Sequence, residues 1–173
     1  TKKRLLLIYP NNFLQGAMGT NNRVAQLVSI FKSIGFCVDQ FGYEHFSNDS
    51  TFANFEAQNK ENIIDNLFLY DFQLGYKSRE VHHDARLHIF CERIRQKAKR
   101  NRSKCYLQDW APEGAKRYFN DIINTNDYDV IVCFYTYLAT LFQNRQISSK
   151  KVYFMEDSMF IQQYSWDKGQ TKG

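Results

Sequence analysis

The fold is decided by residues 4–41, which read RLLLIYPNNFLQGAMGTNNRVAQLVSIFKSIGFCVDQF. They begin with an apolar run at 5–9, and a run without polar alternation is typical of a strand buried on both faces. After a loop of small residues at 16–22, apolar residues recur at the three-and-four spacing of an amphipathic helix: Val24, Leu27, Val28, Phe31 and Ile34. Gly35 stands where a helix ends in a left-handed residue, and a second apolar run follows at 36–41. The stretch predicts a β-loop-α-β unit.

The rest of the chain continues this alternation of strands and helices. We predict a loop at 42–49, a short helix at 50–59, a strand at 63–70, a helix at 78–102, a helix opened by Pro112 and ending at 124–126, a strand at 129–134, a short helix at 138–142 and a strand at 151–155. Strands that are connected by helices form parallel sheets. The predicted fold class is therefore α/β, a Rossmann-like parallel sheet flanked by helices, in a single domain over residues 1–173.

Composition narrows the class of protein. Hydrophobic residues make up 43% of the chain and aromatic residues 16%, which is too apolar for a disordered protein. The formal net charge of +5 favours acidic partners such as phosphates, nucleotides and anionic lipid headgroups. Cys37, Cys91, Cys105 and Cys133 form no Cys-x-x-Cys pair, so we expect reduced thiols and a cytoplasmic location. The sequence has no apolar span of 18 residues and no signal peptide, so we expect no membrane-spanning segment.

The loop after the first predicted strand is the first candidate site. Gly16 and Gly19 let the backbone approach a ligand closely, and the following helix directs its free amides and positive dipole end toward that loop. Side-chain oxygens at 20–22 are suited to capping those amides. The Gly-x-x-Gly spacing is not the dinucleotide fingerprint, and the apolar surroundings of Asp39 argue against a ribose-binding role for it. Two interpretations stay open for the loop, a simple connection and an anion- or sugar-binding site.

The second candidate follows the last predicted strand. Ligands of open parallel sheets bind beyond the carboxyl ends of the strands, an edge that would gather residues 10–22, 42–43, 135–137 and 156–160. Of these, Glu156, Asp157 and Ser158 could accept hydrogen bonds from sugar hydroxyls or orient an acceptor for attack. The alternative is that Asp157 or Ser158 caps a helix that begins at Met159.

Two charged clusters belong to the region around the predicted helix at 78–102. His82, His83, Asp84 and His88 lack the His-x-x-x-His spacing of helical metal ligands, so we expect no metal site. Seven cations follow: Arg93, Arg95, Lys97, Lys99, Arg100, Arg102 and Lys104. They could form a solvated helix face, contact an anionic membrane or bind nucleic acid. Few aromatic residues interleave with them, which argues against binding of single-stranded nucleic acid.

The order of these pieces resembles the start of retaining GT-B glycosyltransferases of the glycogen-synthase-like class. The resemblance rests on Tyr9-Pro10, the loop 16–19, the turn 34–36 and the strand-like segments 127–132 and 151–157. It implies that the chain is the amino-terminal, acceptor-side domain, one half of a two-domain GT-B architecture whose carboxy-terminal donor domain is absent. The loop departs from the commoner adjacent Gly-Gly, and Glu156 stands where the family often has His.

The resemblance also implies a function. The full-length enzyme would transfer a hexose from a nucleotide-sugar donor to a glycan or lipid-linked acceptor, as in surface polysaccharide synthesis, and this domain alone would be inactive. By position, the site residues would be Gly16, Gly19 and Thr20 at the donor phosphates, Asp157 in catalysis, and Glu156, Ser158 and Tyr135 at the acceptor. Arg93, Lys97 and Arg100 would contact an anionic membrane peripherally. We expect no metal, no separate cofactor and no nucleic-acid partner.

Two other functions compete with this expectation. One is a stand-alone flavodoxin-like module that binds a nucleotide or another phosphate-bearing ligand at the same loop. The other is a nucleic-acid-binding protein that uses the cations at 93–104, for which binding would weaken steeply with salt.

Overall fold

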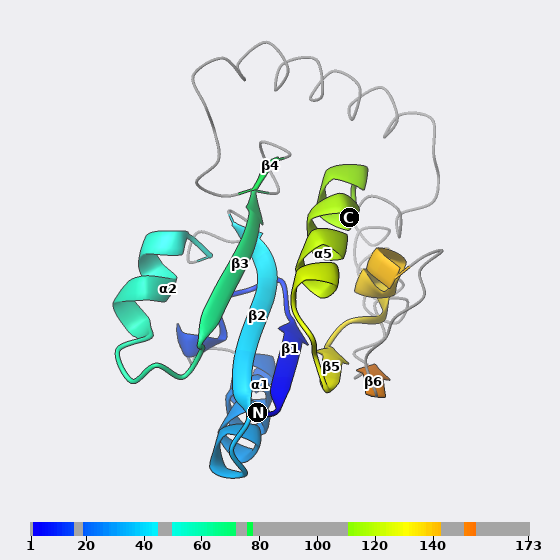
Figure 1. Ribbon diagram of the computed structural model, residues 1–173. Coiled ribbons are helices and arrows are strands. Elements are labelled where there is room, and N and C mark those ends of the chain that lie inside the picture. Colours follow the sequence, from blue (N-terminus) through cyan, green and yellow to red (C-terminus); the bar gives the residue numbers. More distant parts are fainter. Residues whose placement is uncertain are drawn as a thin grey trace, which may run out of the picture.

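The computed structural model describes residues 2–15, 19–44, 50–71, 76–77, 111–142 and 151–154. In this part of the chain a sheet has the strand order β4-β3-β2-β1-β5-β6 (Figure 1). Its strands are β1 (Arg4–Ile8), β2 (Cys37–Glu44), β3 (Asn66–Asp71), β4 (Tyr76–Lys77), β5 (Val130–Cys133) and β6 (Lys151–Phe154). The helices are η1 (Phe13–Gln15), α1 (Gly19–Ser33), α2 (Phe52–Gln58), α5 (Glu113–Thr125) and η3 (Thr136–Phe142), where η marks a 3-10 helix.

Strand β1 lies in the middle of the sheet, between β2 and β5, and runs parallel to both. The β2–β3 and β5–β6 pairs are also parallel, whereas β4 runs antiparallel to β3. When the parallel strands are numbered along the chain, their order is 3-2-1-4-5, as in a Rossmann fold, while a flavodoxin-like sheet has the order 2-1-3-4-5. The predicted α/β class with a Rossmann-like parallel sheet is confirmed.

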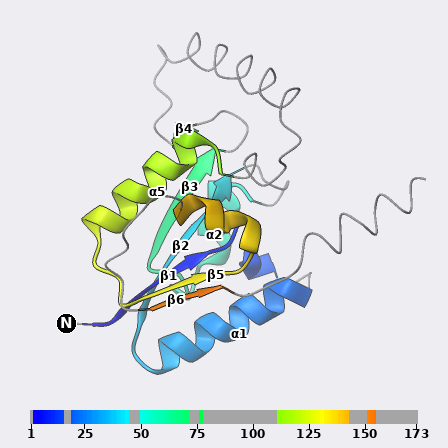
Figure 2. The same ribbon diagram turned by 90° about the vertical axis from the view of Figure 1, so that its right-hand side faces the viewer.

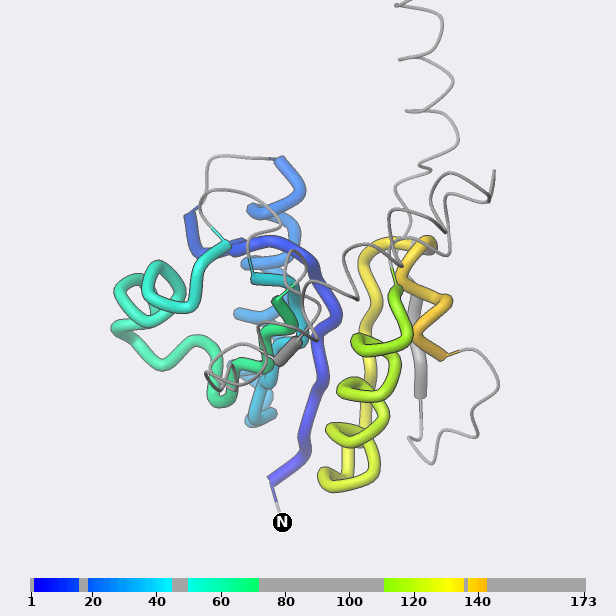
Figure 3. Tube along the Cα trace, turned by 90° about the horizontal axis from the view of Figure 1, so that it is seen from above, coloured from blue at the N-terminus to red at the C-terminus, as the bar shows by residue number. Residues whose placement is uncertain are grey.

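Two apolar layers cover the sheet, one on each face. Alternate β1 residues face opposite ways: Leu5 and Leu7 pack with α1, η1 and α2, whereas Leu6 and Ile8 pack with α5 and η3. Figure 2 shows the sheet between α1 and α5. In Figure 3, α5 and η3 lie side by side, in agreement with the apolar cluster that they share. β1 is therefore buried on both faces, which is why its sequence is apolar without alternation.

The end of α1 confirms the prediction made from Gly35. This residue has φ 89°, the left-handed conformation that glycine adopts without steric cost. Its amide donates to the carbonyl oxygen of Lys32 at 3.0 Å, and the amide of Phe36 donates to that of Phe31 at 3.0 Å. These two bonds form a Schellman motif, and the rings of Phe31 and Phe36 make its hydrophobic contact at 5.0 Å.

Some predicted boundaries are wrong. The predicted loop at 42–49 is strand as far as Glu44, because the strand pairing of β2 with β3 continues to the Glu44–Asp71 pair. Helix α1 begins at Gly19, ahead of the first apolar position at Val24. The short antiparallel strand β4 was not predicted, since two residues are too few to show a periodicity. Residues 45–49 and the predicted helix at 78–102 lie outside the described residues.

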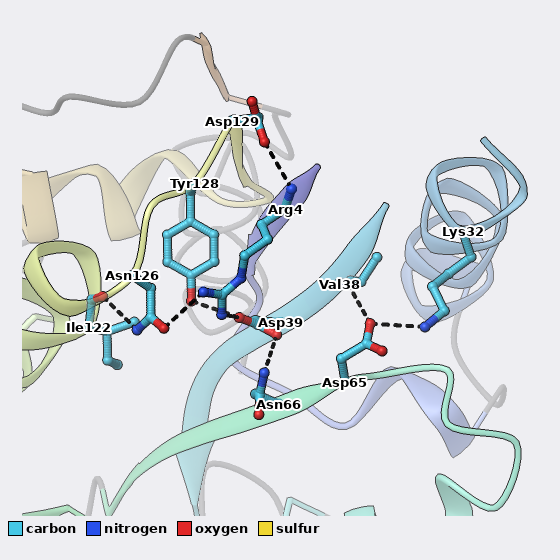
Figure 4. Close-up of polar contacts among 10 residues, drawn as sticks. All are labelled: Arg4, Lys32, Val38, Asp39, Asp65, Asn66, Ile122, Asn126, Tyr128 and Asp129. Carbon is cyan, nitrogen blue, oxygen red and sulfur yellow. Dashed lines mark hydrogen bonds and ion pairs between the residues drawn. The ribbon is translucent and has the colours of Figure 1, made fainter. Parts of the chain in front are cut away.

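The carboxylate of Asp39 joins several elements near the amino ends of the strands (Figure 4). Its side chain is fully buried and forms an ion pair with the guanidinium of Arg4 on β1. It also accepts hydrogen bonds from the side-chain amide of Asn66 on β3 at 2.8 Å and from the hydroxyl of Tyr128 at 2.9 Å. Arg4 in turn donates to the carboxamide of Asn126 at 3.0 Å. One carboxylate thereby holds β1, β2, β3 and the turn between α5 and β5.

Arg4 and Tyr128, two partners of the Asp39 carboxylate, also contact each other. The guanidinium of Arg4 also lies over the ring of Tyr128, 5.0 Å from its centroid. Burial, followed by the negative charge of Asp39, raises the pKa of the Tyr128 phenol well above its ordinary value. Tyr128 therefore keeps its proton and remains a hydrogen-bond donor to Asp39 at neutral pH. These contacts explain how an acidic residue is tolerated inside an apolar strand.

Replacing Asp39 with Leu should lower the free energy of unfolding by about 3 kcal/mol, because the donors of Arg4, Asn66 and Tyr128 lose their common acceptor. Urea denaturation measures this loss. The control is Lys32→Met, which removes the partly exposed pair with Asp65 at 2.9 Å and should cost less than about 1 kcal/mol. Equal losses in both variants would show that Asp39 has no special role.

The α5 face of the core gives a second stability prediction. Phe119 is fully buried, and its ring contacts those of Phe41 at 5.5 Å and Phe142 at 5.1 Å. Phe119→Ala should reduce the free energy of unfolding by about 3–5 kcal/mol through the cavity that it leaves. Exposed Arg117 on the same helix is the control, and its replacement with Ala should change stability by at most about 0.5 kcal/mol. A loss below about 1 kcal/mol for Phe119→Ala would contradict this packing.

Candidate functional site

The carboxyl edge of the sheet has a topological switch point between β1 and β5. The chain leaves β1 toward η1 and α1 on one face, and it leaves β5 toward η3 on the other face. In open α/β sheets the connections that diverge in this way leave a crevice in which ligands bind. The residues that follow the two strands, 9–15 and 134–136, therefore outline the candidate site.

Hydrogen bonds with β2 hold the turn at residues 9–11, directly after β1. The amide of Tyr9 donates to the carbonyl oxygen of Phe41 at 3.0 Å, and that of Tyr43 donates to the carbonyl oxygen of Pro10 at 3.2 Å. The side-chain amide of Gln40 donates to the carbonyl oxygens of Tyr9 at 3.1 Å and Asn11 at 3.0 Å. The direction of the chain after β1 is thus set by both the backbone and one side chain of β2.

Gly42 lets the turn come this close to β2. A Cβ atom at Gly42 would lie only 2.8 Å from the carbonyl oxygen of Tyr9 and 3.3 Å from Leu69. Cβ atoms do not approach a backbone oxygen to within 2.8 Å, so any other residue at position 42 would displace the turn. Glycine is needed at position 42 because two backbone segments approach closely there. An unusual backbone conformation is not the reason, since Gly42 lies in regular strand.

Carboxamide side chains connect the turn to α1 and α2. The hydroxyl of Tyr9 donates to the Oδ1 atom of Asn21 in the first turn of α1 at 2.6 Å. The Nδ2 atom of Asn21 donates to the carbonyl oxygen of Asn12 at 3.4 Å, and that of Asn12 donates to Gln58 on α2 at 3.1 Å. Asn21, one of the residues predicted to cap the helix, lies within its first turn, and its side-chain oxygen accepts from a tyrosine hydroxyl.

The start of α1 is open at Gly19. This residue is exposed, and among the described residues no atom outside its chain neighbours and its own helix backbone lies within 4 Å of the position that a Cβ would take. The first turn of α1, which also contains half-buried Thr20, carries no acidic residue that would offset the positive end of the helix dipole. The described residues therefore leave space at Gly19, and an anion would be favoured at this end of the helix.

Tyr135 lies on the other side of the switch point. Its half-buried ring stacks on that of Tyr9 at 5.7 Å and 20°, and on that of Tyr137 at 5.1 Å and 19°. Tyr9 thereby links the two sides, since its hydroxyl binds Asn21 of α1 and its ring packs on Tyr135. Burial, and then the neighbouring Tyr135, raises the pKa of Tyr137 well above its ordinary value, so its phenol stays protonated.

The structure places only some of the predicted site residues. Gly19, Thr20 and Tyr135 lie around the switch point, whereas Asp39 belongs to the network at the opposite edge of the sheet. Seven others lie outside the described residues: Gly16, Arg93, Lys97, Arg100, Glu156, Asp157 and Ser158. The histidine cluster at 82–88 also lies outside them. In the residues that the structure does describe, no group of three or more His, Cys, Asp or Glu side chains could hold a metal ion.

Sequence reasoning placed Asn12, Asn21 and Gly42 at this edge without their contacts, and it missed Tyr9 and Gln40. One signal was available: Gln40 is a polar residue inside an apolar run, next to Asp39. Buried polar side chains need partners, so such a residue indicates a specific hydrogen-bonding role. The partners themselves lie up to 31 residues away and could not be read from local pattern.

Comparison of the chain with protein-family models, curated proteins and solved structures found no match. None of the helices in the described ranges is long and apolar enough to cross a membrane.

The burial of Cys133 at the end of β5 gives a prediction about the reactivity and the pH dependence of its thiol. Its thiol is fully buried, donates to the carbonyl oxygen of Tyr135 at 3.3 Å, and has a pKa raised by burial from 9.0 to about 12. At pH 8, iodoacetamide should label Cys133 at least about tenfold more slowly in the folded chain than in urea, as followed by mass spectrometry. Because the pKa is raised, the thiol stabilises the fold below pH 9 and loses this effect as pH rises toward 12. Labelling at equal rates would contradict the burial.

Proposed function

We propose that this chain is the acceptor-side half of a GT-B glycosyltransferase that transfers a hexose from a nucleotide sugar to a glycan or a lipid-linked acceptor. The observation that carries the proposal is the arrangement at the switch point of the Rossmann-ordered sheet. An open helix start at Gly19 lies on one side, and an aromatic stack containing Tyr135 lies on the other. Tyr9 contacts both sides.

The helix start supports a role at the donor phosphates. Backbone amides at the beginning of α1 and the positive end of its dipole favour an anion, and Gly19 has no side chain to obstruct one. In sugar transfer, negative charge builds up on the departing nucleotide diphosphate. Fixed dipoles aimed at that charge stabilise the transition state more than the ground state. In this proposal Gly16, Gly19 and Thr20 form that part of the site.

The aromatic stack and the carboxamide of Asn11 support a role at a sugar. A sugar ring presents apolar C–H groups, which pack on aromatic rings, and hydroxyls, which pair with amide groups. The partly exposed ring of Tyr135, after β5, offers the first kind of contact, and the half-buried carboxamide of Asn11, after β1, offers the second.

The remaining roles rest on the sequence resemblance. Asp157 would orient the acceptor hydroxyl and receive its proton, with Glu156 and Ser158 binding the acceptor. Arg93, Lys97 and Arg100 would hold the enzyme on an anionic membrane surface, where lipid-linked acceptors of surface polysaccharide synthesis are found. A second domain would bind the donor nucleotide, so the reaction would take place between two domains. The enzyme would act in the cytoplasm.

The strand order bears on the competing binding-module hypothesis. A flavodoxin-like module would place the second strand of the chain at the sheet edge, whereas here β2 lies between β1 and β3. The nucleotide-binding alternative therefore loses its expected topology, although its ligand chemistry at the start of α1 would be the same. We accordingly favour the transferase.

Gly19→Trp should reduce kcat/KM for sugar transfer by about 100-fold or more, because the indole would occupy the space where the donor phosphates bind. The assay measures product formed by the full-length polypeptide from UDP- and GDP-sugars. Ile30→Trp is the control, since it adds the same bulk at an exposed position of α1, near the opposite end of the helix, and should change the rate by less than about twofold. Unchanged transfer by the Gly19 variant would remove this loop from the site.

A further inference from the structure

Gln40 is unusual among the residues of β2. It lies between Asp39 and Phe41, is fully buried, and shares the α1-facing side of the strand with Val38 and Gly42. Both neighbours on this side are compatible with an apolar layer, whereas a carboxamide is not unless its polar atoms are paired. The position therefore requires an explanation from its contacts.

The two polar atoms of the Gln40 side chain differ in their pairing. Nε2 donates to two successive acceptors on the segment that leaves β1, the carbonyl oxygens of Tyr9 and Asn11. Oε1 is buried and has no hydrogen-bond partner in the described structure. The amide orientation is settled by the two carbonyl oxygens, because a flipped carboxamide would turn its own oxygen toward them.

An unpaired buried oxygen reduces stability, and an apolar side chain of the same shape would not have this cost. Among neutral side chains only a carboxamide supplies two N–H donors from one nitrogen, which is the number of carbonyl oxygens to be held. A residue that gives up stability while fixing the backbone beside a candidate site indicates a positioning role.

We propose that Gln40 is a positioning residue that fixes the path of the chain at residues 9–12, directly after β1. Its hold on Asn11 places the next residue, Asn12, whose carbonyl oxygen accepts from Asn21 in the first turn of α1. The start of α1 at Gly19 is thereby held at a fixed position relative to the stacked rings of Tyr9 and Tyr135. This inference rests on the proposed function insofar as that edge binds the donor phosphates.

The test uses Gln40→Met, which keeps the length of the side chain and removes both donors. Gln26→Met, at an exposed position of α1, is the matched control. Hydrogen exchange, read by mass spectrometry on peptides covering residues 9–15, should become at least about tenfold faster in the Gln40 variant and stay unchanged in the control. The Kd for inorganic pyrophosphate, used as the probe, should rise by about tenfold in the Gln40 variant alone.

A shorter amide separates positioning from simple loss of folding. Gln40→Asn keeps two donors but reaches at most one of the two carbonyl oxygens, so it should give exchange rates between those of the parent and of Gln40→Met. Exchange at 9–15 that is unchanged in a folded Gln40→Met chain would overturn the proposal, as would equal acceleration throughout the sheet. If the parent does not bind pyrophosphate but the exchange result holds, the proposed function fails while the positioning of the turn by Gln40 stands.

Discussion

The structure depends on one buried carboxylate. Asp39 brings Arg4, Asn66 and Tyr128 together from three other parts of the chain, and these contacts hold the amino ends of β1, β2 and β3 in register. A buried charge that loses a partner is costly, so these contacts favour the observed register of the strands. The parallel order that results places β1 between β2 and β5, and this position creates the switch point at the opposite edge.

The two edges of the sheet are stabilised by different chemistry. At the amino edge, charged and phenolic groups around Asp39 satisfy one another. At the carboxyl edge, neutral carboxamides and tyrosine rings set the course of the chain, and the start of α1 remains open at Gly19. The amino edge therefore holds the strands in register, while the carboxyl edge is the one to which we assign ligand binding. This division is the physical basis for assigning function to the carboxyl edge.

Local sequence pattern predicted the elements whose causes are local. The apolar run 5–9 predicted β1, and Gly35 predicted the end of α1, because burial on both faces and a left-handed cap leave marks in neighbouring residues. The roles of Asp39 and Gln40 could not be predicted in this way. Asp39 accepts from the hydroxyl of Tyr128, which is 89 residues away in the sequence. Gln40 donates to backbone carbonyl oxygens, which every residue has, so no residue type marks them as its partners. Of the candidate site, Gly19 and Tyr135 were found from position in the sheet, whereas the Tyr9–Asn21 contact that links them needed the fold.

The central claim is that the carboxyl edge at the switch point is where a nucleotide-sugar ligand binds. Titration of the ¹⁵N-labelled chain with inorganic pyrophosphate, which stands for the donor phosphates, tests it most directly when followed by amide chemical shifts. The account predicts concentration-dependent shifts for Gly19, Thr20 and Tyr135, and none for Gly35 at the opposite end of α1. Shifts confined to the amino edge, around Asp39 and Gly35, would contradict it.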